Sequence, residues 1–102
     1  MRLSEQQCSI IRTAVAENFG LDANVWLFGS RVDDSKRGGD IDLYIEAATD
    51  DADEIVAAKL RFLVTLYKKL GDQKIDVVVR RQSFKENLPI YEIAKQTGVK
   101  LS

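Results

Sequence analysis

The segment 25–45 constrains the fold most strongly, because a polar loop joins two short apolar runs there. Its second run, DIDLYI at 40–45, alternates polar and apolar residues with the period of two that indicates a strand. Asp40, Asp42 and Tyr44 then share one face, and the opposite face is apolar and can be buried. Two carboxylates on one face of a strand lie about 7 Å apart and repel each other unless a cation offsets their charge. The segment therefore predicts a divalent-cation site, since Mg²⁺ prefers hard oxygen ligands.

Composition narrows the classes of function that the chain can have. The chain contains no histidine, which excludes zinc-hydrolase sites and histidine general bases. Its formal net charge of −1 lacks the basic excess of a duplex-binding protein, so we expect no direct nucleic-acid binding. The lone Cys8 excludes an internal disulfide framework and fits a reducing compartment. No signal peptide is visible and no apolar run approaches about 18 residues, so we expect a cytoplasmic protein without a membrane span.

Helical and strand patterns alternate along the chain. Ser4 and Gln7 fit a capping box at the start of a helix. Helices are predicted over about 4–18, 53–70 and 90–97, and strands over 24–28, 40–46 and 74–80. Residues 1–102 are therefore predicted to form a single domain of the α+β class, with a mixed sheet of three or more strands and helices packed mainly on one face.

The helix over 53–70 has the clearest apolar period in the sequence. Apolar side chains recur at steps of four, three, four and three residues, with further apolar residues beside them. They are Val56, Leu60, Leu63, Tyr67 and Leu70, flanked by Ile55, Phe62 and Leu66. We predict that this stripe faces the core.

Asp76 interrupts the apolar strand 74–80, and burying an unpaired carboxylate there would be costly. It can be an edge-strand charge or the partner of a lysine. If its strand lies beside that of Asp40 and Asp42, the three carboxylates can instead converge on one patch. Three converging carboxylates without histidine suit one or two Mg²⁺ ions, as in phosphoryl-transfer enzymes.

The order of these motifs resembles the DNA polymerase β-type nucleotidyltransferase superfamily. Gly29-Ser30, a loop, Asp40-Ile41-Asp42 and a later Asp76 follow one another as in that superfamily. With FGSR and GGDIDLYI in a chain of this length, the sequence is similar to the minimal nucleotidyltransferase (MNT) proteins. The resemblance implies a small polymerase β-like fold. The loop before Asp40 is slightly shorter than is common in that family, and Gly38-Gly39 replaces its more usual polar residue.

By this resemblance, the carboxylates bind metal and catalyse nucleotidyl transfer. Asp40 and Asp42 would hold two Mg²⁺ ions that bridge the phosphates of ATP. Asp76 would complete the second metal site and help to deprotonate the attacking hydroxyl. The transfer needs charge neutralisation and positioning more than covalent help.

The resemblance also assigns nucleotide-binding residues. Gly29 lets the backbone approach the triphosphate, where a side chain would obstruct it. Ser30 can offer its hydroxyl and amide to the phosphates, although an ordinary strand-to-loop turn would also explain the pair. Arg31 is the cation best placed for the triphosphate, whereas Lys36 and Arg37 are equally explained as solvated loop charges.

Three hypotheses about function follow from the resemblance. The chain's size fits the MNT antitoxin of a toxin–antitoxin pair, which transfers AMP from ATP to a tyrosine hydroxyl of a helical HEPN ribonuclease toxin. Alternatively, the protein is a weak or inactive enzyme that neutralises the toxin by binding it, as the altered loop would allow. A third hypothesis is nucleotidyl transfer to a small hydroxylated molecule.

Overall fold

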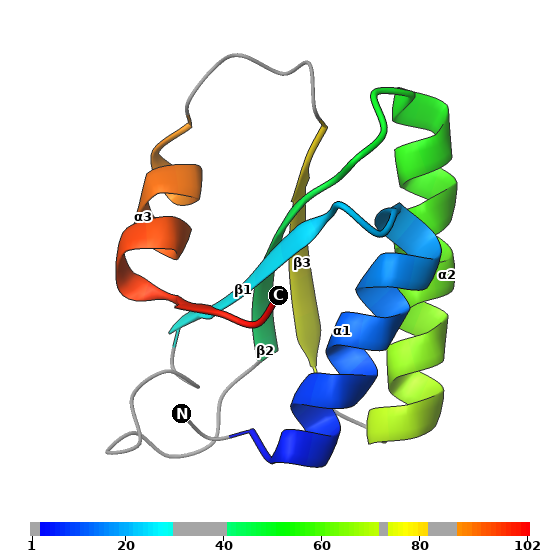
Figure 1. Ribbon diagram of the computed structural model, residues 1–102, viewed down its shortest axis with the longest axis vertical. Coiled ribbons are helices and arrows are strands. Elements are labelled where there is room, and N and C mark those ends of the chain that lie inside the picture. Colours follow the sequence, from blue (N-terminus) through cyan, green and yellow to red (C-terminus); the bar gives the residue numbers. More distant parts are fainter. Residues whose placement is uncertain (1–2, 30–40, 72–73, 82–87) are drawn as a thin grey trace.

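A β-sheet separates two helices on one face from a third helix on the other in the computed structural model (Figure 1). The structure describes residues 3–29, 41–71, 74–81 and 88–102. Its elements are α1 (Glu5–Phe19), β1 (Asn24–Phe28), β2 (Ile41–Glu46), α2 (Ala52–Leu70), β3 (Ile75–Arg80), α3 (Pro89–Thr97) and β4 (Val99–Lys100). The predicted α+β class is confirmed. Within these ranges, no helix is both long and apolar enough to cross a membrane.

The sheet is mixed, and the described strands follow the order β3-β2-β1-β4. β1 runs antiparallel to both β2 and β4, whereas β2 and β3 are parallel. A parallel pair needs a crossover connection, and α2 provides it. The N-terminal ends of β2 and β3 therefore meet at the same end of the sheet, and β1 finishes there.

The two faces of the sheet carry different side chains, as the period of two in β2 predicts. Ile41, Leu43 and Ile45 are fully buried in the main core beneath α1 and α2. Tyr44 lies on the opposite face in a second cluster with Tyr91 of α3. The alternation of β2 thus separates an apolar core from the face that carries its polar residues.

The N-termini of both long helices are capped by side chains. The amide of Gln7 donates to Ser4 Oγ at 3.1 Å, and the amide of Ser4 donates back to Gln7 Oε1 at 2.9 Å. This confirms the predicted capping box. Asp51 caps α2, because Oδ1 of its side chain accepts from the amides of Asp53 and Glu54. Each cap satisfies backbone donors that the first turn of a helix leaves without a partner.

The prediction that the apolar stripe of α2 faces the core is wrong for its outer part. The side of the helix that is buried in the core bears Ala58, Phe62 and Leu66. Val56, Leu60 and Tyr67 are instead exposed, by 62%, 62% and 45%. The reason is that α2 is apolar on most of its circumference, so periodicity alone does not select the buried side. The edge-to-face contact of Phe62 with Phe19 of α1, with ring centroids 5.4 Å apart, fixes that choice.

The short strand β4 was not predicted from the sequence. Val99 and Lys100 pair with β1 directly after α3. The turn between them needs glycine, because a Cβ on Gly98 would overlap the carbonyl oxygens of Ala94 and Leu27. A strand of two residues has no period to detect, so only the close approach at this glycine marks it.

A matched pair of leucine substitutions tests the placement of the core. Leu66→Ala removes a fully buried side chain and should lower the free energy of unfolding by about 2–5 kcal/mol. Leu21→Ala truncates a side chain that is 90% exposed and should change it by less than about 0.5 kcal/mol. Urea unfolding followed by circular dichroism measures both values. Equal effects would contradict the described core.

Candidate active site

Two of the predicted carboxylates lie opposite each other on neighbouring strands. Asp42 is the second residue of β2 and Asp76 the second residue of β3, and the parallel register pairs them directly. Neighbouring strands lie about 4.8 Å apart, and paired positions point to the same face of the sheet. The fold therefore brings two carboxylates together near one end of the sheet, as the sequence prediction required.

Gly29 lies directly beside this pair. It follows Phe28, which is the register partner of Asp42 on β1, and has a φ of +80°. A Cβ built on Gly29 would lie 3.1 Å from Cγ of Asp42 and closer still to Oδ2. The positive φ favours glycine here, and any side chain would in addition have to displace the Asp42 carboxylate. The backbone thus passes next to the Asp42 carboxylate, an approach that a side chain would prevent.

The remaining predicted site residues lie outside the described residues. They are Asp40, Ser30 and Arg31, together with the loop cations Lys36 and Arg37. Their roles stay predictions, as do the catalytic roles of Asp42 and Asp76. Asp42 and Asp76 belong to the described part of the chain, in which no group of three potential metal ligands occurs.

The donors at this site fit a divalent cation. Asp42 is half-buried and Asp76 is exposed, so one carboxylate is held within the sheet and the other faces solvent. Hard cations such as Mg²⁺ use one or two protein carboxylates and complete their coordination with water and substrate phosphates. Asp42 and Asp76 would supply two oxygen ligands, and the absence of a side chain at Gly29 leaves the Asp42 carboxylate in its place.

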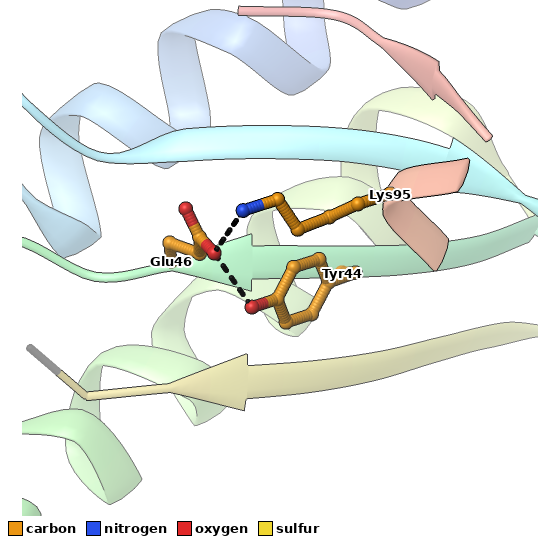
Figure 2. A network of polar contacts seen from close by, with 3 residues as sticks. All are labelled: Tyr44, Glu46 and Lys95. Atoms are coloured by element: carbon orange, nitrogen blue, oxygen red, sulfur yellow. Dashed lines mark hydrogen bonds and ion pairs between the residues drawn. The ribbon is translucent and has the colours of Figure 1, made fainter. Parts of the chain in front are cut away.

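A polar network occupies the same face of the sheet toward the other end of β2 (Figure 2). Tyr44 donates its hydroxyl proton to Oε2 of Glu46 at 2.8 Å, and Lys95 Nζ of α3 lies 3.2 Å from the same oxygen. Burial is the main reason that the pKa of Tyr44 is raised, and its hydrogen bond to Glu46 adds to the effect. Tyr44 is therefore a packing and hydrogen-bonding residue of this face.

Aromatic stacking joins this network to α3. Tyr44 stacks on Tyr91 with ring centroids 5.3 Å apart and contacts Trp26 at the same distance. The Arg80 guanidinium lies 5.0 Å from the Tyr91 ring centroid, and Lys95 Nζ lies 5.3 Å from that of Trp26. The sequence interpretation missed this cluster. Its available signal was Glu46, two residues after Tyr44 and thus on the same face.

A polar hollow of about 350 Å³ lies at the opposite end of β2 and β3 from the aspartate pair. It is lined by both signs of charge, with Asp22 and Glu46 facing Arg80 and Arg81. Glu46 and Arg80 are the last residues of their strands, whereas Asp42 and Asp76 are near the first. The hollow is thus separate from the candidate active site.

The comparison with protein families agrees with this geometry. Residues 8–100 match the family described as nucleotidyltransferase domain, so the match covers most of the chain. The chain therefore belongs to the nucleotidyltransferase domain family, whose members transfer a nucleotidyl group from a nucleoside triphosphate, generally with a divalent metal. A search of curated proteins found no match.

Two glycine substitutions separate backbone strain from obstruction of the site. Gly29→Ala and Gly71→Ala both place an alanine at positive φ, and each should cost about 1 kcal/mol of stability. Only Gly29→Ala also pushes a methyl group into the Asp42 carboxylate, since Gly71 has open space around it. Titration calorimetry with Mn²⁺ should therefore show weakened binding for Gly29→Ala alone. Equal Mn²⁺ affinities of the two variants would refute the proposed crowding.

The raised pKa of Tyr44 predicts a pH-dependent contribution to stability. The folded state holds the hydroxyl proton more tightly than the unfolded chain does. This contribution is fully present below pH ~10, the pKa of an unfolded tyrosine, and declines as the pH rises above it. Tyr44→Phe should lower the free energy of unfolding by about 1 kcal/mol at neutral pH. The difference between wild type and variant should shrink above pH ~10, and urea titrations that gave a constant difference would disprove the assignment.

Proposed function

We propose that the protein transfers AMP from ATP to a tyrosine hydroxyl of a partner HEPN ribonuclease toxin and so acts as its antitoxin. The observation that carries this proposal is the register pairing of Asp42 with Asp76 beside Gly29. Membership of the nucleotidyltransferase domain family supports the reaction type. The identity of the acceptor rests on the resemblance to minimal nucleotidyltransferases.

The openness of the aspartate pair favours a macromolecular acceptor over a small one. Asp76 and Gly29 are exposed. Sites for small molecules are concave and bury most of the ligand surface. A protein that presents a tyrosine side chain to these exposed residues can itself enclose the site.

The proposed reaction is an in-line displacement at the α-phosphorus of ATP. The tyrosine oxygen forms a bond to this phosphorus while the bond to the bridging oxygen breaks, and pyrophosphate leaves with that electron pair. Asp76 accepts the phenolic proton, and Asp42 would hold the divalent cation beside the triphosphate. A divalent cation at this site supplies charge neutralisation for the phosphates. The AMP group then adds a bulky anion to the toxin.

Intact-mass spectrometry tests the reaction directly. The protein is incubated with ATP, Mg²⁺ and the product of the neighbouring gene, which is tested as the candidate HEPN toxin. The toxin should gain the mass of one AMP. Asp42→Asn and Asp76→Asn should each slow this gain by roughly 100-fold or more, because a charged ligand is lost. Asp22→Asn, at the other end of the sheet, is the matched control and should retain the wild-type rate.

A second measurement distinguishes catalysis from neutralisation by binding alone. Cells that express the toxin are supplied with the Asp40→Asn/Asp42→Asn double variant. An AMP transferase loses its protective effect in this variant, whereas an antitoxin that acts by binding still protects. Protection by the double variant, with no mass gain on the toxin, would overturn the proposed enzymatic function.

A further inference from the structure

The outer face of α2 carries an apolar stripe that no described residue covers. Exposed residues at steps of four, four and three form this stripe: Val56, Leu60, Val64 and Tyr67. They lie within about 40° of one line along the helix, which is about 16 Å long between the outermost residues. The stripe points away from Phe62 and Leu66, the side chains that anchor α2 in the core. Figure 1 shows α2 at one side of the molecule, with the sheet between it and α3.

Apolar hollows border the stripe on both sides. Leu60 and Val64 line one of about 420 Å³ together with Glu17 and Asn18 of α1. Val56 lines another of about 320 Å³ between α2 and the edge strand β3. A ridge with a groove along its flank is the surface shape by which helices interdigitate. The contiguous apolar surface therefore has the form of a helix-packing interface.

The charges of α2 show which partner fits this surface. Its first turn is acidic, with Asp53 and Glu54, and its last turn is basic, with Lys68 and Lys69. If a second α2 lies antiparallel to the first, each acidic end meets a basic end. The opposite alignment of the two helix dipoles favours the same arrangement. The charge pattern of the helix is thus complementary to itself.

The stripe has the same self-complementarity. About a two-fold axis level with Phe62, Leu60 of one copy faces Val64 of the other, and Val56 faces Tyr67. Asp53 lies on the line of the stripe and comes opposite the last turn, where Lys68 extends from its flank. A two-fold interface requires that the same patch complement itself in this way. Binding to a helix of an unrelated protein would not require the stripe to be complementary to itself.

We propose that α2 is a homodimer interface, in which it packs antiparallel against α2 of a second copy through Val56, Leu60, Val64 and Tyr67. Asp53 pairs with Lys68 of the partner subunit at each end. This inference is independent of the proposed AMP transfer. A stripe about 16 Å long and about one helix diameter (~10 Å) wide covers less than the roughly 800 Å² per partner of a standard interface. Dimerisation should therefore be weak, with a dissociation constant on the order of 10 μM.

Sedimentation equilibrium over low to high micromolar concentrations tests the dimer with the full chain. Wild type should shift from monomer to dimer as its concentration rises. Leu60→Glu places a charge at the centre of the seam in both copies and should weaken dimerisation about 100-fold or more. Leu21→Glu, on an exposed loop, is the matched control and should dimerise as wild type does. Both positions are exposed in the monomer, and circular dichroism verifies that each variant folds.

Charge reversal tests the antiparallel arrangement itself. Asp53→Lys and Lys68→Asp should each weaken the dimer by roughly tenfold, because like charges then meet at both ends. The double variant restores two opposite pairs and should recover most of the wild-type affinity. The proposal is overturned if wild type stays monomeric throughout, as expected if a different protein covers this face. It is equally overturned if Leu60→Glu dimerises normally or the double variant is no better than the single ones.

Discussion

The parallel pairing of β2 with β3 is the constraint on which the candidate site depends. It sets Asp42 opposite Asp76, although 33 residues and a long helix separate them in the chain. A slip of one residue would move Asp76 to the core face, where an unpaired carboxylate is costly. The burial of Ile75 and Val77 in the main core prevents that slip, because these apolar neighbours would become exposed. Core packing on one face therefore fixes the carboxylate geometry on the other.

The face that bears the aspartates is also stabilised away from them. Tyr44 follows Asp42 on the same side of β2 and is fully buried between Trp26 and Tyr91. Its hydroxyl and Lys95 both bind Glu46, which links α3 to the sheet. The strand that carries Asp42 is thus held by aromatic packing at its centre and by an ion pair at its end. Such support reduces the conformational freedom of Asp42.

Local sequence patterns predicted the elements whose burial or capping is visible in neighbouring residues. The alternation of β2 gave the two faces of the sheet, and Ser4 with Gln7 marked the start of α1. The pairing of Asp42 with Asp76 could be proposed because both interrupt apolar strands. The buried side of α2 could not be predicted, because its own apolar side chains cover most of its circumference. The contact with Phe19 that distinguishes one side is long-range in sequence. β4 was too short to show a period, and the position of α3 depends on rings that are distant in sequence.

The central claim is that a divalent cation binds between Asp42 and Asp76, and paramagnetic broadening by Mn²⁺ tests it most directly. Amide resonances of ¹⁵N-labelled protein are followed as Mn²⁺ is added with a non-hydrolysable ATP analogue. The account predicts the strongest broadening at Gly29, Asp42 and Asp76, with weaker broadening at Glu46 and Arg80, which lie about 13 Å further along the same strands. Broadening that is uniform, or that is centred on Glu46 and Arg80, would contradict it.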